Sequence, residues 1–399
     1  MNTDYDAALG RPVSAPIAPT EQQLKSVLGL CVQKTRGNIK RLADEPKAAA
    51  WALDGDFFTH KEGFYEIGNW TSSFFTGMAL LAWRETEDEY FLNQVLRLLP
   101  NYREKLYVRH LDTHHDIGFL ASLYSVALYK LTGDEQHREM GLRAAEVLSQ
   151  RFNEKGSFIR AWGRVDESES PIAGGQLQTD NMAIIDCLMN LPLLHWASRE
   201  TGLQRYRDIA VRHADMVMKC FIRQDGSVAH AIRFDLDSGQ PLSVDNYCGF
   251  GKDSFWARGL AWAIYGFALS YTHTREERYL QASVCLTKRF LEELDQEWVP
   301  VWDFRLPPGQ VRVRDASASA IVVCGLQELA KHQAVDAKLT SAKNRLLERI
   351  CRPDFLDDSP HCPGILKSGY GNQPAYSSWG DYYLMEAVAR ELKGDATFW

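Results

Sequence analysis

The sequence lacks the cysteine patterns that hold many small metal-binding or disulfide-rich domains together. Its eight cysteines are scattered singly along 399 residues, and no two of them form a Cys-x-x-Cys pair. We therefore expect neither a zinc site nor a disulfide framework. The thiols are expected to be reduced and mostly buried.

A basic cluster and a long apolar run are also missing. The formal net charge is −7, and no extended run of Lys and Arg offsets it, which argues against nonspecific binding to nucleic acid or to anionic membranes. No secretory signal is visible, and no segment has the unbroken apolar length of a membrane span. These absences predict a soluble, cytoplasmic protein with no nucleic-acid or membrane partner, and they leave monomer and homodimer both open.

Aromatic residues, by contrast, are plentiful. The chain has 11 Trp, 16 Tyr and 18 Phe within an apolar fraction of 45%, which is ample for a large core. Planar side chains stack on sugar rings but also fill cores, so their abundance only leans toward a carbohydrate ligand. Pro12, Pro16 and Pro19 predict an irregular arm over residues 1–22. Residues 23–399 are expected to form one catalytic domain.

Helical hairpins recur along this domain. Six times a capping residue precedes an apolar or Ala-rich run, and a charged amphipathic stretch follows. The expected capping residues are Thr71, Thr113, Thr179, Ser254, Asp315 and Ser378. Six hairpins with an apolar first helix and an amphipathic second helix predict an all-α (α/α)6 toroid, in which six inner helices are wrapped by six outer ones. Residues 226–234 alternate as a short extended piece within a long loop.

Two aspartates stand out at the expected inner-helix starts. In a ring, inner helices related by rotation run parallel, so their N-termini open on one face, and that face favours anions. Asp116 and Asp180 each fall in the predicted first turn of an inner helix and should point into this mouth. Glycoside chemistry requires at least a pair of carboxyl groups across a cleft. Helix capping is, however, the commoner role for aspartates at such positions.

One cation lies in a helix made otherwise of aromatic and small residues. Arg258 and Trp262 are four residues apart and share a helix face, with Trp256 in the first turn. A guanidinium beside two indoles could hold the carboxylate of a sugar. Equally, Arg258 could pair with an internal Asp or Glu while the tryptophans belong to the core.

The string His114-His115-Asp116-Ile117-Gly118 also matches the HDIG motif of metal-dependent phosphohydrolases. That chemistry needs further His and Asp ligands on nearby helices. His110 and His213 are candidates but follow no matching pattern, so this alternative has little support from the sequence.

Taken together, the motifs resemble those of the unsaturated glucuronyl hydrolases of glycoside hydrolase family 88, over residues 25–393. The matching segments are Trp70-Thr71, residues 115–119, Thr-Asp-Asn-Met at 179–182, His230, Phe234-Asp235, Ser238-Gly239, Ser-Phe-Trp-Ala-Arg-Gly at 254–259, Gly-Ile-Leu-Lys at 364–367 and Trp-Gly-Asp-Tyr-Tyr at 379–383. The tryptophan-arginine segment and the two ordered aspartates are the specific part of this resemblance.

The resemblance implies hydration of a C4=C5 double bond on a terminal unsaturated uronic acid, with release of the remaining saccharide and without a cofactor or metal. It implies that Asp180 is the general acid and base and that Asp116 is the second essential carboxylate. It also implies that substrate-binding side chains surround the sugar: Trp70, His115, Trp162, His230, Trp256, Arg258 and Trp262.

Two departures from the family pattern bear on specificity. Cys248 stands where relatives carry a glutamine that helps the site, and residues 367–379, where relatives differ in recognising the next sugar and its sulfates, form a short segment. The identity of the next sugar is therefore open. Other functions also remain open: an unsaturated galacturonyl-rhamnose hydrolase, a conventional glycosidase on the same toroid, or a uronate-binding protein without turnover.

Overall fold

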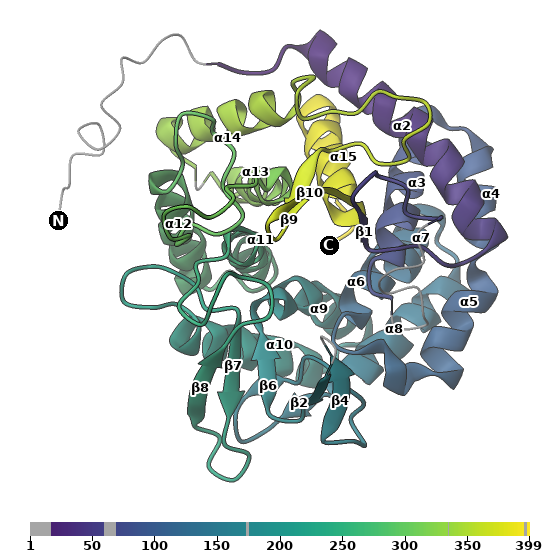
Figure 1. The fold of residues 1–399 in the computed structure, drawn as a ribbon. Helices are drawn as coiled ribbons and strands as arrows, with labels where there is room; N and C mark the ends of the chain where they lie inside the picture. Colours follow the sequence, from purple (N-terminus) through teal and green to yellow (C-terminus); the bar gives the residue numbers. More distant parts are fainter. Residues whose placement is uncertain (1–16, 60–68, 173–174, 334, 395–396) are drawn as a thin grey trace.

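The computed structural model describes residues 17–59, 69–172, 175–333, 335–394 and 397–399. Within them, helices form two concentric layers around a central axis (Figure 1). The predicted (α/α)6 toroid is therefore confirmed. The expected irregular arm falls mainly on residues 1–16, which lie outside the described residues, and helix α2 begins at Glu21, ahead of the expected domain start at residue 23.

The inner layer is a closed ring in which each helix contacts the next and α15 returns to α3. Its members are α3 (Ser72–Thr86), α6 (Ile117–Ala121) with the π-helical η3 (Ser122–Val126) and α7 (Ala127–Thr132), the 3-10 helix η4 (Ile185–Asn190) with α9 (Leu191–Thr201), α11 (Ala257–Thr274), α13 (Ala316–Ala330) and α15 (Ser378–Lys393). Residues 257–270 of α11 are buried on every side. This all-round burial is what an inner helix packed between neighbours requires.

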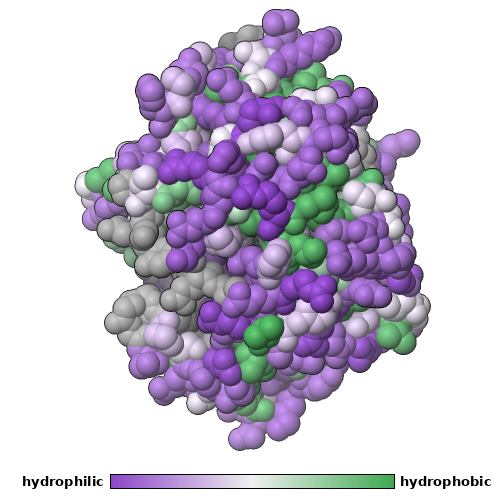
Figure 2. Space-filling view, turned by 90° about the vertical axis from the view of Figure 1, so that its right-hand side faces the viewer, coloured by the Kyte–Doolittle hydropathy of each residue, from purple (hydrophilic) through white to green (hydrophobic). Residues whose placement is uncertain are grey.

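The outer layer consists of amphipathic helices that bury one stripe each. Its members are α2 (Glu21–Asp44), α4 (Glu89–Leu96) with α5 (Leu99–Arg103), α8 (Glu135–Ser149), α10 (Gln204–Cys220), α12 (Glu277–Glu292) and α14 (Ala337–Ile350), and η1 (Glu104–Val108) and η2 (His110–Thr113) link α5 to the inner ring. Figure 2 shows a mostly hydrophilic surface on one side of the molecule, with apolar residues between the polar ones. No helix formed by the described residues is long and apolar enough to cross a bilayer.

Short antiparallel strands join the hairpins. The pairings are β1 (Trp51–Ala52) with β10 (Gln373–Ser377) and β9 (Ser368–Tyr370), β2 (Phe152–Asn153) with β3 (Phe158–Ile159), β4 (Glu169–Ile172) with β5 (Gly175–Gln178), and β6 (Met182–Ile184) with β7 (Ala231–Phe234) and β8 (Pro241–Asp245). Of the extended piece expected at residues 226–234, residues 231–234 form β7. Near the centre of Figure 1, β9 and β10 lie over the ring.

Several helices begin later than their sequence patterns predict. Asp315 caps α13 by accepting from the Ala318 N–H, as expected. Thr179, by contrast, precedes a strand, because residues 182–184 pair with β7 and the chain then makes a 3-10 helix before α9 starts near Pro192. Proline fits a first helical turn because its missing N–H has no partner there anyway. The expectation that Thr179 starts an inner helix is therefore wrong.

A close approach between α6 and η4 brings two parts of the inner ring together. A Cβ atom on Gly118 would lie 2.5 Å from the Asn190 Cα atom, so only glycine fits at this position. The side-chain oxygen of Asn190 accepts a hydrogen bond of 2.7 Å from the Phe119 N–H. This contact sets the separation of the two segments at the end of the ring where the expected site lies.

Replacing this glycine should destabilise the ring. In Gly118→Ala the added methyl group meets backbone atoms of Asn190, so we expect the free energy of unfolding to fall by about 1–3 kcal/mol. Urea unfolding followed by circular dichroism measures this change. The matched control is Gly29→Ala on exposed α2, where nothing lies within 4 Å and stability should rise by up to about 1 kcal/mol. Equal effects in the two variants would contradict the close-packing argument.

Candidate functional site

The N-termini of the inner helices gather at one end of the ring, as the toroid predicts. Trp70 precedes α3 and stacks on Trp379 of α15, with ring centroids 5.4 Å apart. Asp116 is the residue before α6, and Asp315 caps α13. Side chains from segments far apart in the sequence therefore share one mouth.

Asp116 is buried at this mouth. Its carboxyl group lies 3.4 Å from Nε2 of His115, and the nearby Asn190 side chain opposes the rise in its pKa. Burial raises the pKa of Asp116 well above its usual range, and the negative charge of Asp186 raises it further.

Asp186 is the acidic partner that the sequence patterns missed. It lies in the first turn of η4, and its side chain is 13% exposed. One carboxyl oxygen, Oδ2, is buried and has no hydrogen-bond partner. Burial raises the pKa of Asp186 to about 7. A sequence signal did exist, because Asp186 is the only charged residue in the apolar run of residues 182–194.

Asp180 occupies a different environment. It follows β5, is half-buried, and lies within electrostatic reach of the Arg160 guanidinium. One of its oxygens is shielded from solvent and unpartnered. Because β6 separates Asp180 from the inner helix, the expected position in a first helical turn is wrong. The charge that acts on Asp116 belongs to Asp186, six residues further along the chain.

Two buried histidines accompany the carboxyl groups. Nδ1 of His230 accepts a 3.0 Å hydrogen bond from the Tyr247 N–H, so Nε2 carries the ring proton, 3.9 Å from Oδ2 of Asp186. Burial lowers the pKa of His230 to about 3 and that of His115 well below its usual range. Both rings are therefore neutral near pH 7, and His230 presents an N–H donor toward the acid.

Aromatic side chains line one side of this group. The His230 ring lies 5.2 Å from Trp256 and 6.1 Å from Trp162, centroid to centroid, and Trp162 lies 5.2 Å from Tyr247. Trp70 is half-buried beside Phe119. The structure thus brings together Trp162, His230 and Trp256 as expected. Trp262 differs, because it is 1% exposed and belongs to the core.

Arg151 is a buried cation that sequence reasoning did not single out. Its guanidinium donates to the carbonyl oxygens of Arg160, Ala161 and Gly163, on both sides of Trp162. Its positive charge also opposes the rise in the Asp116 pKa. Arg151 therefore fixes the Trp162 loop and balances charge at the mouth.

Arg258 has an internal partner. Its Nη1 atom lies 2.5 Å from Oδ2 of Asp315, and both side chains are at least 95% buried. The guanidinium is sandwiched between Trp256 and Trp379, each 4.9 Å from it. The alternative interpretation, in which Arg258 pairs with an internal acid, is thus realised. Arg258 nevertheless lines the cavity described next.

A cavity of about 330 Å³ opens beside the paired charges. It is lined by Tyr247, Cys248, Gly249, Phe250, Arg258, Trp302, Gln310, Tyr370, Gly371 and Asn372. Cys248, the departure noted in the sequence, feels the charges of both Asp186 and Arg258, so the cavity adjoins the acidic pair. Burial raises the pKa of Cys248 to about 12, and the thiol is therefore neutral.

The HDIG string does not assemble a metal centre within the described part of the chain. No three His, Cys, Asp or Glu side chains gather there as metal ligands. His213 is engaged elsewhere, since its Nδ1 accepts from the Ile159 N–H. The ligand set that a metal phosphohydrolase requires is thus not formed by these residues.

Comparisons with known proteins agree with this geometry. The model of Glycosyl Hydrolase Family 88 matches residues 41–388. Unsaturated chondroitin disaccharide hydrolase of Streptococcus pneumoniae is 35% identical over 341 residues, which cover 83% of this chain and 83% of that protein. Unsaturated glucuronyl hydrolase of Bacillus sp. is 33% identical over 398 residues, covering 95% and 98%.

Solved structures match equally well. The unsaturated glucuronyl hydrolase of Streptococcus agalactiae superposes with a TM-score of 0.85 at 27% identity, covering 99% of this chain and 97% of that one. The enzyme of Bacillus sp. GL1, described as responsible for the degradation of glycosaminoglycan, gives 0.83 at 31% identity, covering 95% and 99%. The family resemblance inferred from the motifs is confirmed.

Removing the charge of Asp315 should destabilise the protein strongly. Asparagine still caps a helix but cannot neutralise Arg258, so Asp315→Asn should lower the free energy of unfolding by about 3–5 kcal/mol. Urea unfolding measures the loss. Asp88→Asn is the matched control, because Asp88 also caps a helix and pairs with an arginine but is exposed. It should cost less than about 1 kcal/mol, and a similar loss in both variants would refute a special role for the buried pair.

Proposed function

We propose an activity for this chain on the premise that it belongs to glycosyl hydrolase family 88, as the match over residues 41–388 shows. The chain is a glycoside hydrolase. We infer that it removes a terminal 4,5-unsaturated glucuronic acid from lyase-generated oligosaccharides by hydrating the C4=C5 double bond. Relatives at 33–35% identity are unsaturated glucuronyl and unsaturated chondroitin disaccharide hydrolases, which supports this substrate class.

The observation that carries the proposal is the Asp116–Asp186 pair, two carboxyl groups largely shielded from water beside aromatic side chains. Asp186 has a pKa of about 7, and its buried Oδ2 has no partner. Two buried carboxyl groups that repel each other do not both ionise easily, so the Asp116–Asp186 pair retains a proton near neutral pH. An enol ether needs such a proton at C4 before water can add.

The reaction then proceeds as follows. The carboxyl group of Asp186 gives its proton to C4, and positive charge develops at C5 and on the ring oxygen. The Asp186 carboxylate next takes a proton from a water molecule, whose oxygen bonds to C5. The resulting hemiketal opens, the sugar at C1 leaves, and Asp186 is again protonated. One water is consumed overall.

Neighbouring groups support this sequence. Asp116 shares the proton of the pair with Asp186, and the positive charge of Arg151 opposes the rise in the Asp116 pKa. The Nε2–H group of His230 faces Asp186 and orients its carboxyl group or the incoming water. Trp70 and Trp162, which are partly exposed, offer ring faces for the planar unsaturated sugar. Trp256 and Arg258 are buried, and Arg258 is paired with Asp315. His115 packs against Asp116. Trp262 belongs to the core.

We assign the acid and base roles to Asp186 in preference to Asp180. The pKa of Asp186 is raised to about 7 by its surroundings and Asp186 is coupled to Asp116, whereas Asp180 lies beside the Arg160 guanidinium. An acid must be desolvated to hold its proton at neutral pH.

The function is tested by the ultraviolet absorbance of the conjugated double bond. The protein should abolish this absorbance in unsaturated glucuronyl disaccharides, and in heavy water deuterium should appear at C4. Asp186→Asn should lower kcat/KM at least about 100-fold because the proton donor is lost. Asp180→Asn is the matched control and should stay within about tenfold of the parent.

Each alternative has its own outcome. Release of sugar from a saturated glucuronide would identify a conventional glycosidase, since double-bond hydration cannot use that substrate. Persistent absorbance across glycosaminoglycan, gellan, xanthan, ulvan and pectin digests would overturn the proposal. An inactive Asp180→Asn beside an active Asp186→Asn would return the acid role to Asp180.

The pH dependence follows from the same carboxyl group. Asp186 carries its proton below its pKa and loses it as the pH rises through about 7. The value of kcat/KM should therefore fall on the alkaline side, by about tenfold per pH unit well above 7. Initial rates between pH 5 and 9 measure this, with circular dichroism to show that the fold persists. A flat profile up to pH 9 would exclude Asp186 as the proton donor.

A further inference from the structure

The cavity wall formed by residues 247–250 depends on a buried carboxylate that does not itself line the cavity. Asp303 is fully buried, at 0% exposure. Its Oδ2 accepts a 2.9 Å hydrogen bond from the Phe250 N–H, and its Oδ1 accepts from the N–H groups of Phe255 and Arg305, at 3.1 and 2.9 Å. One side chain thus ties together the cavity wall, the residue before Trp256 and the loop that carries Trp302.

Gly249 lies directly against this carboxylate. A Cβ atom at that position would fall 2.9 Å from Oδ2 of Asp303 and 2.1 Å from Oγ of Ser254. Asn246 braces the same residue from the other side, because its amide accepts from the Gly249 N–H and donates to the Gly249 carbonyl oxygen. The wall therefore lies so close to Asp303 and Ser254 that only glycine fits at position 249.

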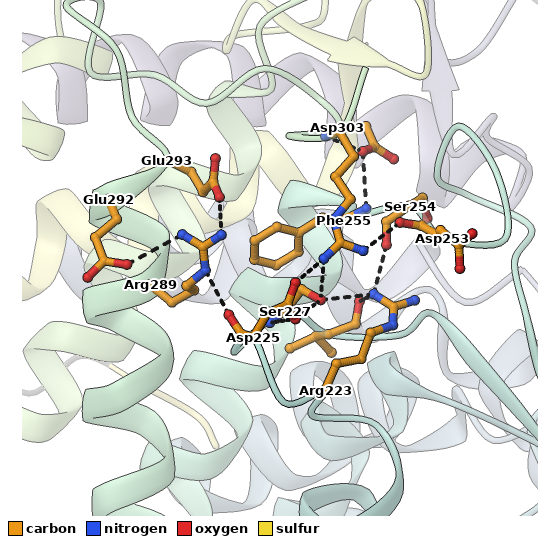
Figure 3. Close-up of polar contacts among 12 residues, drawn as sticks. Arg223, Asp225, Ser227, Asp253, Ser254, Phe255, Arg289, Glu292, Glu293 and Asp303 are labelled. Carbon is orange, nitrogen blue, oxygen red and sulfur yellow. Dashed lines mark hydrogen bonds and ion pairs between the residues drawn. The ribbon is translucent and has the colours of Figure 1, made fainter. Parts of the chain in front are cut away.

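A cluster of arginines fixes the segments on which Asp303 acts (Figure 3). Arg305 pairs with Asp225 and donates to the Asp253 carbonyl oxygen, and Arg223 donates to the Ser254 carbonyl oxygen. The Arg289 guanidinium also packs on the Phe255 ring, 5.4 Å from the ring centroid. Figure 3 shows Arg223 and Arg289 near Phe255. The start of α11 cannot shift without breaking several of these bonds.

The wall faces the part of the cavity beyond the acidic pair. Its exposed element is the Phe250 ring, 45% exposed and edge-on to Trp302 at 6.4 Å. Gln310 and Asn372 add neutral hydrogen-bonding groups to the lining of the same cavity. The lone charged residue in the lining is Arg258, which is already paired with Asp315. Aromatic faces with amide groups suit an uncharged sugar ring.

We propose that Asp303 is a positioning residue that sets the wall of residues 247–250 for the saccharide leaving from C1. This inference rests on the proposed function. Asp303 acts through the backbone of Gly249 and Phe250, so it controls binding of the leaving saccharide and leaves the protonation step to Asp186. Because the residues of this wall are uncharged, they favour a leaving saccharide that carries no charge where it contacts residues 247–250.

The test compares two substrates that share the unsaturated uronic acid. One is an unsaturated disaccharide, and the other is the methyl glycoside, which has no leaving sugar to touch the wall. In Asp303→Asn the amide group can accept on one oxygen only, so either the Phe250 bond or the Phe255 and Arg305 bonds are lost. The KM for the disaccharide should rise about tenfold, while its kcat and the KM of the methyl glycoside stay within about threefold.

A second variant alters the contact between Gly249 and Asp303 by changing the glycine instead of the aspartate. Gly249→Ala pushes the backbone off Asp303 and should reproduce the selective rise in KM. Asp215→Asn is the control, because Asp215 pairs with Arg278 on the outer helices and accepts no bond from the wall. It should leave both substrates unchanged. The two variants together keep the test valid if one of them folds poorly.

The outcomes separate this inference from the proposed function. If the parent protein leaves both substrates intact, the proposed function fails. If the parent is active but the variants raise KM equally for both substrates, or lower kcat alone, the positioning role is overturned. An unchanged KM in both variants would overturn it as well.

Discussion

The site depends on how closely two inner segments approach each other. Gly118 of α6 packs on the backbone of Asn190, and the Asn190 side-chain oxygen accepts a hydrogen bond from the Phe119 N–H. This single contact places the residue before α6 beside the first turn of η4. Asp116 and Asp186 are therefore close enough for the charge of one to raise the pKa of the other. A larger residue at Gly118 would separate them.

Exclusion of water decides what these groups can do. The same burial raises the pKa of Asp186 to about 7 and lowers that of His230 to about 3. Near neutral pH the Asp116–Asp186 pair therefore retains a proton while the His230 ring stays neutral, which is the state that the proposed reaction requires. The aromatic residues that would stack on a sugar also remove the water, so binding and acidity arise from the same side chains.

The arginines near the site stabilise the surrounding structure as well as providing positive charge near a ligand. Arg258 is committed to Asp315, Arg151 to three carbonyl oxygens, and Arg305 to Asp225. Each of them fixes a loop that carries a site residue. In the proposed reaction, these local cations offset the chain charge of −7 near the place where an anionic sugar would bind.

The sequence by itself determined the toroid, the family and most of the aromatic wall, because apolar periodicity, helix caps and the tryptophan-arginine motif are local signals. Only the tertiary structure decided which aspartate faces Asp116 and which partner Arg258 takes. Both choices depend on long-range packing: β6 pairs with β7 and delays the inner helix past Asp180, and Asp315 lies 57 residues from Arg258. Local patterns place residues on helices, but distances between helices come from how the ring closes.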